Sequence, residues 1–248
     1  MSAELSRPGK ILKATDLAAG YDGRPIVSDI SFEAAPGKVI SIVGPNGSGK
    51  STLLKSLVGV VKIYSGSVVV DGQAITNLPP EEIAKLGIGY VPQIDDVFPP
   101  LTVKENLEIG GYLLRRSEIS NRIDEVVGYF PKLKSMMSRK AGKLSGGERK
   151  MLAMGRVLML APAVLVLDEP TANLAPIIAA QLLEEYIRGF ADHGSTVIIV
   201  EQRAKAVLKI SDWTYVLGGG RIALAGAPKE LESNPEFIES FLGGGAKH

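Results

Sequence analysis

The chain has 248 residues, 45% of them hydrophobic, which is enough to bury the core of one compact α/β domain with a subdomain. Its formal net charge is +1 with acids and bases interspersed, so no basic stripe points to a nucleic-acid partner. The sequence contains no cysteine, which excludes disulfides and thiolate metal sites. No apolar stretch is long enough to span a bilayer and no signal peptide opens the sequence, so we expect a cytosolic protein or one peripheral on a membrane's inner face.

The first quarter of the chain predicts β-structure followed by a glycine-rich loop. Residues 1–10 are polar and are expected to be a disordered tail. Residues 11–35 predict two strands around a Gly-rich turn, in an antiparallel β layer. The run KVISIV at 38–43 is typical of a buried strand, and the helix expected at 51–58 follows the loop GPNGSGKS at 44–51.

This loop has the form G-x-x-x-x-G-K-[ST] of a P-loop. Its glycines let backbone N–H groups converge on phosphate oxygens at a helix N-terminus, where Lys50 can reach the β- and γ-phosphates and Ser51 can hold Mg²⁺. The alternative is a Gly-rich turn that matches by accident, which the strand before the loop and the helix after it disfavour. The expected nucleotide-binding residues here are Gly44, Pro45, Asn46, Gly47, Ser48, Gly49, Lys50, Ser51 and Thr52.

The middle of the chain predicts a mixture of strands and helices. A strand is expected at 67–70, a short helix at 80–86 and a strand at 88–91 that ends near Gln93. The loop at 94–102 contains adjacent prolines and apolar residues. Helices are expected at 103–114, 119–130 and 148–160, and they define a helical subdomain over about 94–160.

The last third of the chain returns to the parallel sheet. Strands are expected at 164–167 and 196–200, with a helix at 177–193 between them. A hairpin at 213–225, a helix at 228–242 and a flexible tail at 243–248 complete the chain, and the core is expected to cover about 11–93 and 161–242.

Two carboxylates follow the apolar run VLVL: Asp168 and Glu169. Ligands collect at the carboxyl ends of parallel strands, so we expect Asp168 to share Mg²⁺ with Ser51, and Glu169 to polarise the attacking water. An ordinary acidic strand end before a proline turn would give the same letters. The pairing with the P-loop favours the Mg²⁺ interpretation.

The string LSGGE at 144–148 is the signature motif of the ATP-binding cassette (ABC) family, which the chain resembles over 11–242. The resemblance implies an α/β fold with a P-loop NTPase core and a parallel sheet, an antiparallel β layer and an inserted α-helical subdomain. It also implies that Ser145, Gly146 and Gly147 contact the γ-phosphate of an ATP bound by a second cassette. The alternative is a serine N-cap followed by a glycine turn, which explains the helix start but not the whole string.

Other positions carry further expectations from the resemblance. Tyr21 matches the aromatic residue that stacks on adenine, and Gln93 matches the glutamine that senses Mg²⁺ and water and links the core to the helical subdomain. Gln202 stands where the family has a switch histidine, and Ala175 stands where it has the D-loop aspartate. An amide donates a hydrogen bond but carries no proton at neutral pH, so we expect Glu169, Lys50 and Gln202 to carry catalysis.

With these departures and the motifs EPT-x-x-L-A-P and VEQ, the chain resembles the cassettes of branched-chain amino-acid uptake systems. We therefore expect a dimeric, ATP- and Mg²⁺-dependent ATPase subunit of an importer on the cytoplasmic face of the inner membrane. Its permease is expected to contact Phe98 and Leu101, and a solute-binding protein would act indirectly. The alternatives are plain packing under the loop for Phe98 and Leu101, and a tyrosine in a Gly-rich turn for Tyr21. A soluble ABC ATPase without a permease, for example in cofactor assembly, is the alternative, and a small-metabolite kinase has no use for LSGGE.

Overall fold

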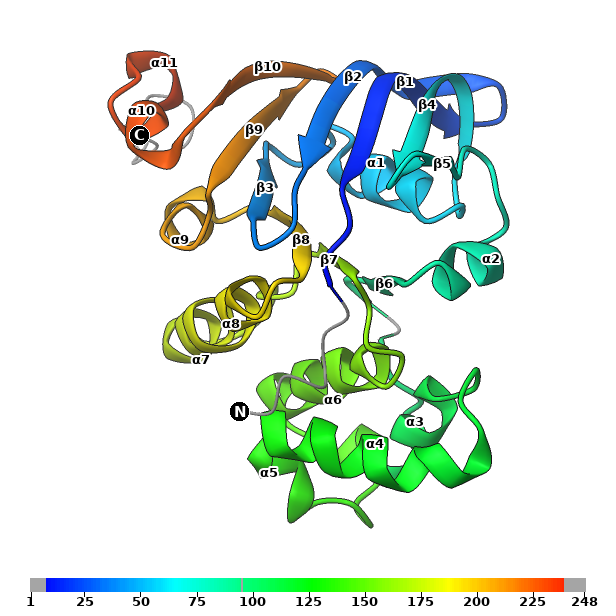
Figure 1. The fold of residues 1–248 in the computed structure, drawn as a ribbon. Helices are drawn as coiled ribbons and strands as arrows, with labels where there is room; N and C mark the ends of the chain where they lie inside the picture. The colour runs from blue at the N-terminus through cyan, green and yellow to red at the C-terminus, as the bar shows by residue number, and fades with distance from the viewer. Residues whose placement is uncertain (1–7, 95, 239–248) are drawn as a thin grey trace.

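The computed structural model describes residues 8–94 and 96–238, and a six-stranded sheet forms its centre (Figure 1). The strand order is β10-β9-β3-β8-β7-β6, and every neighbouring pair is parallel except β9 and β10. The strands are β3 (Val39–Val43), β6 (Ile88–Val91), β7 (Val164–Asp168), β8 (Thr196–Glu201), β9 (Trp213–Gly218) and β10 (Arg221–Gly226). A strand buried on both faces is built mainly of apolar residues, and β3, β7 and β8 are buried throughout.

A second, antiparallel sheet packs over the first and has the order β2-β1-β4-β5. Its strands are β1 (Leu12–Tyr21), β2 (Arg24–Ala34), β4 (Lys62–Val70) and β5 (Gln73–Ala74). The expected antiparallel β layer is therefore confirmed. The strand expected at 67–70 begins earlier, at Lys62, because its residues pair with β1 as far as Lys62 opposite Gly20.

The helices divide between two lobes in Figure 1. The upper lobe carries α1 (Lys50–Leu57), α2 (Pro80–Lys85), α7 (Pro176–Gln181), the π-helix η3 (Leu182–Ile187), α8 (Arg188–Asp192), α9 (Ala204–Leu208), α10 (Pro228–Glu232) and α11 (Pro235–Phe237). The lower lobe consists of α3 (Val103–Gly110), α4 (Arg116–Tyr129), α5 (Pro131–Lys134), the 3₁₀ helix η2 (Ala141–Lys143) and α6 (Gly146–Leu158).

Two hydrophobic clusters lie on opposite faces of the six-stranded sheet. Val197 and Ile199 of β8 join the cluster that extends into the lower lobe, whereas Ile198 and Val200 join the cluster under the antiparallel sheet. This split follows from the two-residue period of a strand. Both clusters therefore pack against the central sheet and hold its strands in place. The loops that follow the parallel strands leave from one edge of this sheet.

Several predicted helix boundaries are wrong, each for a local reason. The helix expected at 228–242 is interrupted within the described residues: α10 ends at Glu232, and Asn234 caps a new turn that begins at Pro235, which has no N–H to continue a helix. The helix expected from 148 begins at Gly146, because Ser145 already caps it. The helix expected to end at 114 ends at Gly110.

The predicted tails fall mostly on residues 1–7 and 239–248, which lie outside the described part of the chain. Lys10, at the end of the predicted N-terminal tail, contacts the end of α2 and the start of β8: its Nζ donates to the carbonyl of Leu86 at 2.9 Å, and its carbonyl accepts from Thr196 Oγ1 at 2.6 Å. Over residues 8–94 and 96–238, no helix combines the length and the apolar character needed to cross a bilayer.

Candidate nucleotide-binding site

The P-loop between β3 and α1 is shaped by its glycines. Gly47 and Gly49 have φ values of 78° and 96°, a region that side chains with a Cβ rarely adopt. A Cβ on Gly44 would lie 2.4 Å from the carbonyl oxygen of Leu217. Gly49 is the N-cap of α1 and no side chain caps the helix there, so its first amides are available to an anion.

Lys50 is the first residue of α1 and its side chain is only 4% exposed. Its Nζ donates to the carbonyls of Gly44 at 2.9 Å and Pro45 at 3.0 Å, and lies 3.9 Å from Glu169 Oε1. Burial lowers the pKa of Lys50, and the nearby carboxylates of Glu169, Asp168 and Glu201 oppose that shift. This enclosed ammonium can therefore meet a phosphate without first shedding a full shell of water.

Ser51 and Asp168 meet although 117 positions separate them in the sequence. Ser51 Oγ donates to Asp168 Oδ1 at 2.9 Å, and the Tyr90 hydroxyl donates to Asp168 Oδ2 at 3.3 Å. Burial, with the Asp168 charge, raises the pKa of Tyr90, which keeps its hydroxyl a donor. A hydroxyl and a carboxylate are the hard oxygen ligands that Mg²⁺ prefers, so the donor set fits this ion.

Glu169 follows β7 at a sharp bend. Its φ is 44°, which is strained for a residue with a Cβ, and its N–H donates to the carbonyl of Val200 at 3.0 Å. Its Oε2 accepts a hydrogen bond from Gln93 Nε2 at 2.7 Å. The bend and the amide together hold the Glu169 carboxylate at the edge where the parallel strands end.

These groups surround a cavity of about 450 Å³. Its lining is Ile26, Asn46, Gly47, Gly49, Lys50, Ser51, Thr52, Gln93, Glu169 and Gln202. The loop residues Gly44, Pro45 and Ser48 are not in this lining, and the buried Ser48 Oγ has no hydrogen-bond partner among the described residues. Tyr21, 48% exposed at the end of β1, is not in this lining. Ile26 does line the cavity, although no sequence motif pointed to it.

The signature segment lies apart from this cavity. Ser145 caps α6 through a reciprocal pair of bonds: Ser145 N–H donates to Glu148 Oε2 at 2.8 Å, and Glu148 N–H donates to Ser145 Oγ at 3.4 Å. Ser145 and Gly146 are exposed, and a Cβ on Gly147 would lie 2.8 Å from Ile178 Cγ2 of α7. Ser145, Gly146 and Gly147 therefore do not line the nucleotide cavity of their own chain.

A buried carboxylate that the sequence analysis missed joins two loops of the site. Glu201, the last residue of β8, accepts from Thr171 N–H at 2.9 Å and from Thr171 Oγ1 at 2.7 Å. The bond ties the segment after Glu169 to the segment that carries Gln202. Its signal was a charged residue closing an otherwise apolar strand, TVIIVE.

We expect Glu201→Gln to make the protein more stable at about pH 8 and to lose most of that advantage at about pH 4, below the usual pKa of a glutamate. Burial raises the pKa of Glu201 above that of the unfolded chain, so its ionisation weakens folding as the pH rises through that window. The amide cannot ionise, yet its oxygen still accepts both bonds from Thr171. Urea unfolding at the two pH values measures the difference, and a pH-independent difference would contradict this assignment.

Residues 27–172 match the family model described as ABC transporter. The chain belongs to the ABC transporter family. This ABC cassette is 44% identical over 233 residues to the probable branched-chain amino acid transport ATP-binding protein LivF of Archaeoglobus fulgidus, covering 94% of this chain and 99% of that one. It is 40% identical over 230 residues to the high-affinity branched-chain amino acid transport ATP-binding protein BraG of Pseudomonas aeruginosa, covering 92% and 98%. The predicted resemblance is confirmed.

Solved structures confirm the predicted fold class of the cassette. It superposes with a TM-score of 0.84 on an ABC transporter cassette in its ADP conformation, at 31% identity, covering 94% of this chain and 99% of that one. A nucleotide-free cassette gives the same TM-score at 30% identity, covering 93% and 98%. The chain therefore has the fold of an ABC ATPase, an enzyme that binds and hydrolyses ATP.

Proposed function

We propose that this chain is the ATP-hydrolysing subunit of an importer for branched-chain or related amino acids, and that it works as a dimer of cassettes. The cargo is supported by the names of LivF and BraG, which match nearly the whole chain, and the direction rests on the resemblance to uptake systems alone. The observation that carries the ATPase assignment is the convergence of Lys50, Glu169 and the Ser51–Asp168 pair on one cavity. The proposed cassette spans 11–242, with α3 to α6 as its helical subdomain.

The roles of the residues follow from their chemistry. Ser51, Asp168 and the Gln93 amide oxygen would hold Mg²⁺, which neutralises phosphate oxygens. Lys50 and the amides that open α1 would bind the β- and γ-phosphates. Glu169 would accept the proton of the attacking water, because its carboxylate borders the cavity. Gln202, in the same lining, would donate a hydrogen bond to the γ-phosphate.

A second cassette is supported by the face that carries Ser145. This residue is exposed outside its own nucleotide cavity, so it is free to complete the site of another cassette. Ile177, in the first turn of α7 and directly after the D-loop segment, has 82% of its side chain exposed. An isoleucine this exposed next to functional loops is typical of a surface that becomes covered by a partner.

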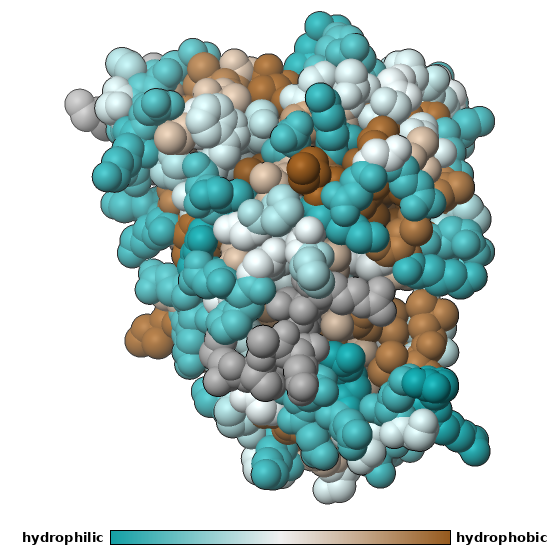
Figure 2. Space-filling view, viewed as in Figure 1, coloured by the Kyte–Doolittle hydropathy of each residue, from teal (hydrophilic) through white to brown (hydrophobic). Residues whose placement is uncertain are grey.

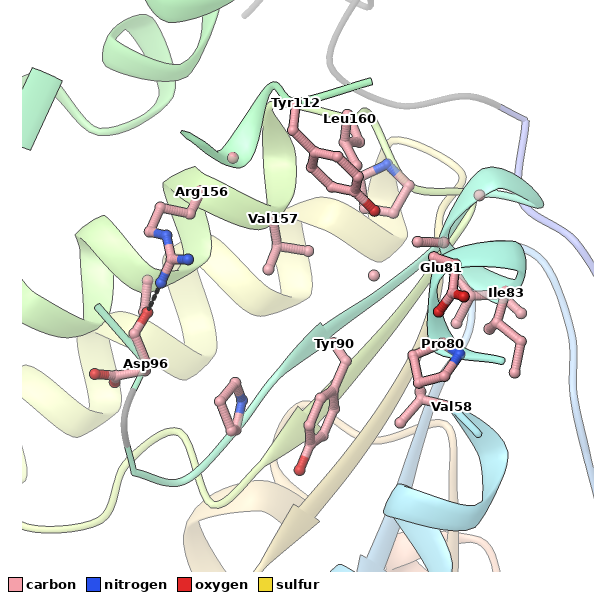
Figure 3. A pocket seen from close by; sticks show the side chains of 18 of the residues that line it. Val58, Pro80, Glu81, Ile83, Tyr90, Asp96, Tyr112, Arg156, Val157 and Leu160 are labelled. Carbon is pink, nitrogen blue, oxygen red and sulfur yellow. Dashed lines mark hydrogen bonds between the residues drawn. The ribbon is translucent and has the colours of Figure 1, made fainter. Parts of the chain in front are cut away.

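A permease is supported by a groove of about 540 Å³ between the two lobes. Figure 2 shows hydrophobic surface at the right of the view where the lobes meet, and Figure 3 shows Tyr112, Val157 and Leu160 along the groove. Phe98, 43% exposed, borders it through Arg156, and half-buried Leu101 donates its N–H to the Phe98 carbonyl at 3.1 Å. We infer that the groove receives a segment of the permease on the cytoplasmic face, with a solute-binding protein beyond it.

The direction of transport is the most specific statement in this proposal. A relative that is 32% identical over 238 residues, covering 94% of this chain and 97% of that one, is the lipopolysaccharide export system ATP-binding protein LptB of Haemophilus influenzae. The higher identity to LivF and BraG favours an amino-acid cargo, and import remains the proposed direction. A soluble cassette without a permease remains the alternative, and purification from membranes separates the two: a polytopic partner supports the proposal, and a soluble scaffold overturns it.

Phe98→Glu is expected to weaken the association with the permease by about tenfold or more, because a carboxylate would enter an apolar contact. The measurement is recovery of the tagged cassette in detergent-solubilised complexes, with uptake of labelled leucine as the second readout. Tyr64→Glu, on the antiparallel sheet away from the groove, is the matched control. If Phe98→Glu copurifies with the permease as the unmodified chain does, Phe98 is not a contact.

A further inference from the structure

The segment that links the two lobes is anchored to the lower one. Asn106 of α3 accepts from Phe98 N–H at 2.8 Å and donates to the Phe98 carbonyl at 3.1 Å. Arg156 of α6 donates to the carbonyl of Asp96, as the dashed line in Figure 3 shows, and its guanidinium lies 4.5 Å from the centre of the Phe98 ring. Residues 96–98 therefore move with the helices α3 and α6.

Lys150 extends this anchor to Gln93. It lies in the second turn of α6, and its Nζ donates to Asp96 Oδ2 at 2.7 Å and to the carbonyl of Gln93 at 2.8 Å. The two charged side chains are only 8% and 6% exposed. A buried ammonium needs both a counter-charge and hydrogen-bond acceptors, and here Asp96 and Gln93 provide them.

The side chain of Gln93 then crosses to the other lobe. Its Nε2 donates to Glu169 Oε2 at 2.7 Å, while its own carbonyl is held by Lys150. A displacement of α6 relative to β7 must therefore act on the contact between Gln93 and Glu169. Arg156 and Asp96 border the groove at one end, so an occupant of the groove touches the same anchor (Figure 3).

We propose that Lys150 and Asp96 are a positioning pair for Glu169, acting through Gln93. The pair fixes the main chain of Gln93, and Gln93 fixes the orientation of the carboxylate that accepts the proton of the attacking water. The inference rests on the proposed role of Glu169 in hydrolysis.

Two variants separate positioning from simple stabilisation. Lys150→Met leaves Asp96 buried without its counter-charge, so it lowers stability whatever else the pair does. Lys150→Met combined with Asp96→Leu replaces the pair by apolar side chains, which restores packing in many buried ion pairs but leaves Gln93 untethered. For each purified variant, KM for Mg-ATP and kcat per nucleotide-binding site are measured. The urea midpoint of unfolding is measured on the same samples.

We expect kcat to fall about tenfold or more in both variants while KM stays within about threefold, because only the orientation of the reacting group changes. The urea midpoint recovers in the double variant but kcat does not. Lys104→Met removes an exposed partner of Glu108 in the same lobe and serves as the control, with unchanged kcat. A double variant that regains kcat, or a single variant that keeps it, overturns the proposal.

Glu169→Gln, assayed in the same experiment, separates the proposed catalytic role of Glu169 from the proposed positioning role of Lys150 and Asp96. If it hydrolyses ATP at the wild-type rate, the role of Glu169 fails and the positioning pair fails with it. If it is inactive while Lys150→Met keeps its kcat, the ATPase assignment stands and only the positioning pair is wrong.

Discussion

Glu169→Gln is expected to bind Mg-ATP at least as tightly as the unmodified chain and to hydrolyse it about 10²–10⁴ times more slowly. The amide cannot accept the proton of water at neutral pH, whereas its oxygen can still accept the 2.7 Å hydrogen bond from Gln93. Removing one negative charge near Lys50 also favours the phosphates. The geometry of the site should therefore survive while the chemistry stops.

The measurements are steady-state phosphate release and size-exclusion chromatography with Mg-ATP, in which the variant should persist as a dimer. Glu184→Gln, the same isosteric change on the exposed face of η3, is the control and should behave as the unmodified chain. Hydrolysis by Glu169→Gln at more than about a tenth of the normal rate would show that another group accepts the proton.

Mixing two inactive variants, Lys50→Ala and Ser145→Arg, is expected to restore ATP hydrolysis. Each substitution alone should abolish activity, because every site of a homodimer would contain the lesion. In a mixed dimer with the proposed arrangement, both lesions fall in one site and the other site is intact. At equal amounts the rate should recover to up to about a quarter of normal, since half of the dimers are mixed and each has one working site.

A second mixture gives the matched control for this experiment. Lys50 and Glu169 border the same cavity of one chain, 3.9 Å apart, so a mixture of Lys50→Ala and Glu169→Gln leaves no intact site in any dimer. It should stay inactive. Recovery in both mixtures, or in neither, would contradict a site shared between the P-loop of one cassette and Ser145 of another.

The parts of the site that the sequence predicted well are those written in consecutive residues. The P-loop required particular glycines, and Asp168 followed an apolar strand. Parallel strands of one sheet end at the same edge, which brings Ser51 and Asp168 together although β8 lies between β3 and β7. The same is true of the fold class, because runs such as VISIV and TVIIV suit only strands that are buried on both faces.

The remaining features depend on contacts between distant segments. Lys150 has the sequence appearance of a solvent-exposed lysine on an amphipathic helix, and only the packing of the lower lobe against Gln93 and Asp96 buries it. Tyr90 lies within a strand, and its contact with Asp168 requires the register that places Tyr90 opposite Val166. No local pattern encodes such pairings, since each depends on how two separately formed elements meet.

The groove between the lobes has a practical consequence for handling the isolated chain. Val60 and Tyr112 at its rim are more than half exposed. Isolated molecules therefore expose apolar surface through which they can associate with one another. Such association weakens in the cold, because the hydrophobic attraction between apolar surfaces becomes weaker as the temperature falls. Concentrated stocks should accordingly stay clear longer on ice or with mild detergent than at room temperature in plain buffer.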